Sequence, residues 1–157
     1  MQPFLYKRAA SMNRTFIERQ LTKINFWSPI TSYYDCLPAP HSGVITANTP
    51  WSGAFEIAPT LWAVSHITQF AEPGWRFIDD IGRTLPKGGS IVGLTSPNGK
   101  DISVIIETTE ATADQSLLIT TPKTFATSVM HLWRTDQMES FIQQEDLTPG
   151  DRLFPIC

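Results

Sequence analysis

Carboxylates are the side chains of this sequence with the most direct chemistry, because two of them across a glycosidic bond can cleave it. A retaining glycosidase holds its two carboxyl groups about 5 to 5.5 Å apart, and an inverting one about 6.5 to 9.5 Å apart. The candidate carboxylates fall at the ends of expected strands or in polar turns, without an aromatic pocket around them: Asp79, Asp80, Glu107, Glu110, Glu145 and Asp146. We therefore expect each of them on the solvated surface, and no catalytic pair within the chain.

Histidine, cysteine and glycine suggest no further site. The three histidines have no Cys, Asp or Glu at metal-ligand spacing. His66 shares a helix face with Trp62 and Phe70, which favours a hydrogen-bonded packing histidine over a ligand or base. Cys36 and Cys157 are isolated, so free thiols are expected. We predict no metal ion and no cofactor.

A phosphate-binding loop is also absent from the pattern. Lys87-Gly-Gly-Ser90 lacks the further glycines and the following helix that such a loop needs. We expect this segment to form a turn before a strand.

Tryptophan is the remaining informative residue type, because an indole can pack against the apolar face of a sugar or anchor a core. Four tryptophans lie in or beside expected regular elements and are predicted to be core residues: Trp51, Trp62, Trp75 and Trp133. Trp27 differs, because it closes an expected strand and is followed at once by Ser28-Pro29. A barrel enzyme presents residues to substrate at the carboxyl ends of its strands, so Trp27 is the candidate substrate-binding residue.

One helix organises the chain. Pro59 and Thr60 mark its start, because proline lacks an amide hydrogen that the first turn would leave unpaired. Apolar residues follow at three- and four-residue spacing as far as Phe70, and Pro73-Gly74 ends the run. Before it, residues 44–47 and 54–57 predict a small hairpin.

The N-terminal pattern is weaker. Residues 1–20 fit either a short amphipathic helix over 14–19 or a poorly ordered tail. Residues 21–27 alternate as a strand that the Ser28-Pro29 break would end. Residues 29–35 fit a turn of helix.

After the organising helix the period changes to two. Residues 90–95 and 102–108 flank Asn98-Gly99, which predicts a hairpin because both residues tolerate the positive φ of such turns. Further strands are expected at 117–120, 124–132 and 139–144. Five or six strands with short turns imply an antiparallel sheet or half of a sandwich. The predicted fold class is therefore α+β and mainly antiparallel.

Composition bounds the remaining possibilities. A chain of 157 residues with 41% hydrophobic and 17% charged residues suits one ordinary globular domain. A net charge of -3 argues against a nucleic-acid partner. The N-terminus has no apolar core for a signal peptide, and no run approaches a membrane span. Asn13-Arg-Thr15 fits the glycosylation acceptor pattern, which is frequent by chance.

Short motifs occur in one order along residues 15–147. They are Thr31-Ser-Tyr-Tyr-Asp-Cys-Leu-Pro38, Thr49-Pro-Trp-Ser-Gly53, Leu61-Trp62, Ser65-His66, Thr68-Gln-Phe70, Pro73-Gly-Trp75, Lys87-Gly-Gly-Ser90, Ile105-Ile-Glu-Thr108, Phe125-Ala-Thr127 and Leu132-Trp-Arg-Thr135. As a colinear series they resemble glycoside hydrolase family 59, the galactosylceramidases.

The resemblance implies a (β/α)8 barrel, a β-sandwich built from both sides of the barrel in sequence, and a C-terminal lectin domain. It also implies retaining hydrolysis of the β-galactosyl bond of galactosylceramide and related lipids by two glutamates, in a lysosomal or secreted enzyme. On that plan residues 1–20 are a poorly ordered or helical lead-in. Residues 21–72 are the end of the barrel, with strand eight, a hairpin and the last helix, and residues 73–157 are an incomplete β-sandwich.

The resemblance transfers one active-site position. Trp27 matches the tryptophan at the end of strand eight that lines the galactose pocket in the family. The family's pocket tyrosine corresponds to Ala39, and its sugar-contacting arginine falls in residues 110–121, which contain no arginine. Both glutamates would lie upstream of residue 1, and the lectin domain beyond residue 157.

These departures limit the expected activity. Retaining hydrolysis needs a nucleophile and an acid/base together, so we expect the isolated chain to be inactive. Its partner, through a parent enzyme, would be a galactosyl lipid or β-galactoside, and an unpaired sheet edge could self-associate. The alternatives are a non-catalytic β-sandwich that binds carbohydrate or protein, with Trp27 and Trp51 exposed, and a product that does not fold.

Overall fold

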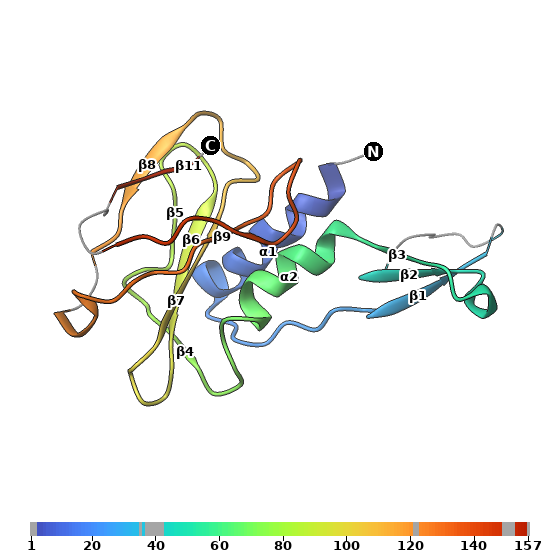
Figure 1. Cartoon of the computed structure of the whole chain (residues 1–157), viewed down its shortest axis with the longest axis horizontal. Helices are drawn as coiled ribbons and strands as arrows, with labels where there is room; N and C mark the ends of the chain where they lie inside the picture. Colours follow the sequence, from blue (N-terminus) through green and yellow to red (C-terminus); the bar gives the residue numbers. More distant parts are fainter. Residues whose placement is uncertain (1–2, 35, 37–42, 121–122, 149–152, 157) are drawn as a thin grey trace.

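A computed structural model describes residues 3–34, 36, 43–120, 123–148 and 153–156. Two α-helices lie in the middle of the molecule, with a small three-stranded sheet on one side and the remaining strands on the other (Figure 1). None of the described helices combines the length and the apolar character needed to cross a membrane.

Helix α1 (Pro3–Arg19) is longer than the short helix considered for this region. Its buried face includes Asn13 and Phe16, and Phe16 stacks on Phe77 with ring centroids 3.9 Å apart. Gly82 lies against the same ring, because a Cβ there would come within 3.1 Å of it. The helix ends at Gln20, whose φ of 55° is left-handed and whose amide donates to the Phe16 carbonyl at 2.8 Å. Helix α1 is thus part of the hydrophobic core.

The three-stranded sheet corrects two predictions. Residues 21–27 form no strand, and the helical turn expected at 29–35 is instead a strand, β1 (Ile30–Tyr33). It pairs in parallel with β2 (Ile45–Asn48), which pairs antiparallel with β3 (Phe55–Ile57). A strand is defined by its partners, and in the described part of the chain residues 22–27 make no backbone hydrogen bond.

The predicted hairpin and helix are confirmed. Strands β2 and β3 flank a 3₁₀ turn, η1 (Pro50–Ser52). Helix α2 (Pro59–Thr68) begins with proline at its first position, as expected, and ends before the Pro73-Gly74 break. It packs against α1, so the two helices lie side by side at the centre of the molecule (Figure 1).

The larger sheet is organised by β6 (Ser90–Thr95). It pairs antiparallel with β4 (Arg76–Phe77), β5 (Arg83–Thr84) and β7 (Ile102–Glu107). The predicted β6–β7 hairpin is confirmed, and Gly99 has the left-handed φ of 68° that its turn requires. The Lys87-Gly-Gly-Ser90 segment is a turn, also as predicted.

Strand β6 is buried on both faces. Val92 and Leu94 pack with Phe16 of α1, whereas Ile91 packs with Leu117 of β8 (Gln115–Leu118). Strand β8 pairs antiparallel with β11 (Leu153–Ile156), which gives β6 a helix on one side and a second strand pair on the other. This double covering explains why residues 90–95 form a nearly continuous buried run.

The last segment is less regular than predicted. It contains η2 (Lys123–Phe125) and a short antiparallel pair, β9 (Trp133–Arg134) with β10 (Ile142–Gln143). The strand expected at 124–132 is wrong, because only an isolated bridge at Met130 forms there. Val129 and Leu132 are exposed, so no buried face stabilises a strand. The chain is therefore mixed α+β with mostly antiparallel strands.

Candidate functional site

Trp27 stands at the junction between the unpaired segment 21–27 and the three-stranded sheet. Its side chain is 90% exposed. The backbone directly after it is fixed, because the Ser28 carbonyl accepts the Val44 amide at 3.0 Å. The Ser28 hydroxyl donates to the Ile30 carbonyl at 2.8 Å and lies 3.0 Å from the Thr31 hydroxyl. An exposed indole on a fixed backbone can present its apolar face to a ligand.

Trp51 does not belong to the core as predicted. It lies in η1 and is 94% exposed. The turn that carries it is held by the Ser52 hydroxyl, which donates to the Asn48 carbonyl at 2.8 Å and accepts the Ala54 amide at 3.1 Å. A three-residue turn at the tip of a hairpin has no layer above it in the described residues, so its indole stays in water.

The other three expected core tryptophans are partly buried. Trp62 and Trp133 join an aromatic cluster with Phe70 and Phe141, and Trp75 packs against the Phe16 core. The cluster holds α2 against the β9–β10 pair.

His66 is the packing histidine that the sequence predicted. Its Nε2 lies 2.8 Å from the Thr135 hydroxyl, and its ring meets Phe141 edge-on at 5.2 Å between centroids. Burial lowers the pKa of His66 below its ordinary value. The residue therefore acts within the contact between α2 and the C-terminal strands.

Glu107 corrects the expectation of a solvated carboxylate. It is 7% exposed and faces Ser90 across the β6–β7 pair. The Ser90 hydroxyl donates to it, and the Thr109 amide donates to its other oxygen at 3.0 Å. These bonds occupy both carboxylate oxygens, so Glu107 reads as a structural group.

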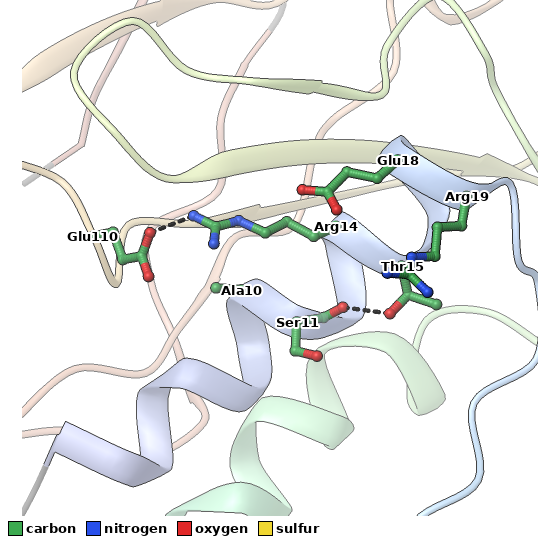
Figure 2. A pocket seen from close by; sticks show the side chains of 7 residues that line it. All are labelled: Ala10, Ser11, Arg14, Thr15, Glu18, Arg19 and Glu110. Atoms are coloured by element: carbon green, nitrogen blue, oxygen red, sulfur yellow. Dashed lines mark hydrogen bonds and ion pairs between the residues drawn. The ribbon is translucent and has the colours of Figure 1, made fainter.

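A shallow hollow beside α1 offers no better catalytic arrangement. Figure 2 shows that Arg14 reaches across it to the carboxylate of Glu110, with Glu18 and Arg19 nearby on the same helix. The ion pair raises the pKa of Arg14, chiefly through the hydrogen bond from Glu110. Among the described residues, no group of three His, Cys, Asp or Glu side chains could hold a metal ion.

The positions that the resemblance identified are not gathered in one pocket. Trp27 lies beside the three-stranded sheet, and Glu110, at the start of the segment without arginine, lies against α1. Ala39 lies outside the described residues. Asn13, the glycosylation candidate, is buried and lies 3.5 Å from the Ser90 carbonyl, so its amide is not accessible.

An apolar surface on the three-stranded sheet escaped the sequence analysis. Ile30, Phe55 and Ile57 are exposed on one face of it. The apolar alternation of the hairpin was visible, but alternation alone does not show which face of a sheet is covered. A second signal was available, because residues 24–75 contain no lysine or arginine.

Comparison with known proteins adds the family context. Residues 4–69 match glycosyl hydrolase family 59. The chain is 41% identical to a galactocerebrosidase of Mus musculus over 97 residues, which is 62% of this chain and 14% of that protein. It is 37% identical to one of Salmo salar over 114 residues, which is 73% of this chain and 16% of that protein. The chain thus spans about 14 to 16% of the length of these curated relatives.

Proposed function

Because residues 4–69 carry a galactocerebrosidase-like segment of glycosyl hydrolase family 59, we propose that the chain supplies part of a retaining glycosidase that acts on β-galactosyl lipids. Residues 21–72 contribute the end of a (β/α)8 barrel, and residues 73–157 contribute part of a β-sandwich. The order of α1, the segment 21–27 and α2 supports this, since helices and strands alternate in such a barrel. The side-by-side packing of α1 and α2 is also that of neighbouring barrel helices.

Trp27 is the substrate-contacting residue of this proposal. The observation that carries it is the 90% exposed indole on a fixed backbone at the end of segment 21–27. An apolar ring in that place can cover the C–H face of a galactosyl group, which removes both apolar surfaces from water.

The chain alone is proposed to be inactive. The two carboxylates nearest to a hollow in the described residues are committed elsewhere, Glu107 to Ser90 and Glu110 to Arg14. Retaining hydrolysis would need two further carboxylates about 5 to 5.5 Å apart. In this proposal they come from outside the chain, as does the compartment signal of a lysosomal or secreted enzyme. The unpaired edge next to segment 21–27 then pairs with further barrel strands, or with another edge.

The experiment begins with the native product in its source cells. An antibody against the β6–β7 hairpin should capture a protein larger than 17.6 kDa that hydrolyses galactosylceramide. In that protein Trp27→Ala should lower kcat/KM by roughly 10- to 100-fold, the range expected when one buried aromatic contact is lost. Trp51→Ala is the matched control, because Trp51 is equally exposed but lies at a hairpin tip.

Two outcomes would overturn the proposal. A captured product of 17.6 kDa without hydrolase activity would exclude a glycosidase and leave a binding module. Equal effects of Trp27→Ala and Trp51→Ala in an active protein would remove Trp27 from the substrate site.

A further inference from the structure

The three-stranded sheet has one apolar and one polar face. The register places Ile30 beside Ile45 and Ile57, and Phe55 beside Ala47, so these five residues share one face. The same register places Thr31, Thr46 and Glu56 on the other face. We call the first set the apolar face.

The covered face of this sheet is the polar one. Thr46, at the centre of the polar face, is 2% exposed. On the apolar face, Ile30 is 62%, Phe55 64% and Ile57 41% exposed. This is the reverse of an ordinary two-layer protein, in which the apolar side of a sheet is buried. A contiguous exposed apolar surface of this kind marks an interaction site.

Charge restricts what can bind there. Residues 24–75 contain no lysine or arginine, so the surface lacks the cations that would hold a nucleic acid or an anionic membrane. The acidic Glu56 belongs to the polar face through its register with Thr46. The apolar face therefore carries no charge of its own, and two such faces can meet without repulsion.

The area available is that of a small interface. An exposed indole lies at each end of the sheet, because Trp27 precedes β1 and Trp51 follows β2. With about 200 Å² for a fully exposed aromatic side chain, these two indoles and Phe55 present roughly 500 Å². Ile30 and Ile57 bring the total close to the ~800 Å² that each partner of a specific dimer buries.

We propose that the apolar face is a self-association surface on which a second copy of this chain packs, face to face, to form a symmetric dimer. Edge-to-edge pairing through β1 would leave Phe55 and Ile57 in water. Face-to-face packing at about 10 Å between sheets removes both from water. The proposal concerns the 157-residue chain and does not rest on the proposed glycosidase activity.

Analytical ultracentrifugation of the full chain over a wide concentration range tests this directly. The expected result is a reversible equilibrium between 17.6 kDa and twice that mass. The double variant Phe55→Ser/Ile57→Ser should remain a monomer at concentrations where the unchanged chain is a dimer, with at least a 100-fold weaker association. Met138→Ser is the control, because Met138 is an equally exposed apolar residue remote from the sheet, and it should leave the dimer unchanged.

A second variant guards against misfolding. If circular dichroism shows that the double variant is unfolded, Ile30→Ser removes an apolar side chain from a different strand of the same face and should also weaken the dimer. A chain that is monomeric at every concentration, or a dimer that survives both variants in folded form, would refute the proposal.

Discussion

Phe16→Ala should be among the most destabilising substitutions in this chain. Phe16 is 3% exposed and fills the space between α1 and the β6 sheet, where it packs with Val92, Leu94 and Ile105 and stacks on Phe77. Truncating a fully buried phenylalanine to alanine costs about 3 to 5 kcal/mol, because transfer energy is lost and a cavity remains. Against a total of about 5 to 15 kcal/mol, this is a large fraction of the stability of a domain.

Urea and thermal unfolding measure the effect. A loss of about 4 kcal/mol corresponds to a Tm lowered by roughly 8 to 16 °C in a domain of this size. Met138→Ala provides the control, because that side chain is almost fully exposed, and its change should stay within about 0.5 kcal/mol.

Gly82 allows a sharper version of the same test. A methyl group at Gly82 would press on the Phe16 ring, so Gly82→Ala alone should cost about 1 to 3 kcal/mol. In the Phe16→Ala background the methyl enters the vacated space, and the added cost should shrink by at least about 1 kcal/mol. A Phe16→Ala variant as stable as the control, or strictly additive changes, would refute the placement of α1 in the core.

Three further predictions concern single groups. Burial lowers the pKa of His66 below its ordinary value of 6.5, so the unfolded chain binds the proton more readily. Stability should therefore be complete above pH 6.5 and fall as the pH drops through the lowered pKa; thermal melts of His66→Gln should lose this dependence. Glu107→Gln should cost about 1 to 3 kcal/mol in urea unfolding, since an amide cannot accept from both Ser90 and Thr109. Gly99→Ala should cost about 1 to 2 kcal/mol through its left-handed φ alone, because nothing lies within 4 Å of its added Cβ, whereas Lys100→Ala should be neutral.

Local sequence signals predicted the elements whose stability is local. Pro59 fixed the start of α2, and Asn98-Gly99 fixed the β6–β7 hairpin, because both act through backbone dihedrals that neighbouring residues do not change. Trp27 was singled out in the same way, from the Ser28-Pro29 break that follows it. These signals need no knowledge of distant contacts.

The failures share the opposite cause. Glu107 looked like a surface carboxylate, and only its register with Ser90 brings it inside the sheet. Trp51 looked like a core residue, and only the position of its turn at a hairpin tip leaves it exposed. The apolar face of the β1–β3 sheet was not foreseen, because the sequence does not state which face is covered. In each case a contact distant in sequence decides the outcome.

Segment 21–27 carries the same lesson into a measurement. Its alternation predicts a strand, but residues 22–27 make no backbone hydrogen bond within the described part of the chain, so their amides lack the protection of a ladder. Hydrogen exchange of these amides should be close to that of an unfolded peptide. The amides shared by β6 and β7 should exchange only by large-scale opening, since that pair lies in the core.

The same measurement separates the two ways in which this chain could associate. Face-to-face dimers cover Phe55 and Ile57 and leave the amides of residues 22–27 free to exchange, so exchange there should not change with protein concentration. Edge pairing would add strands beside residues 22–27 and slow their exchange as the concentration rises. Slow exchange at every concentration would mean that segment 21–27 is already paired, and would contradict the unpaired edge on which the barrel proposal depends.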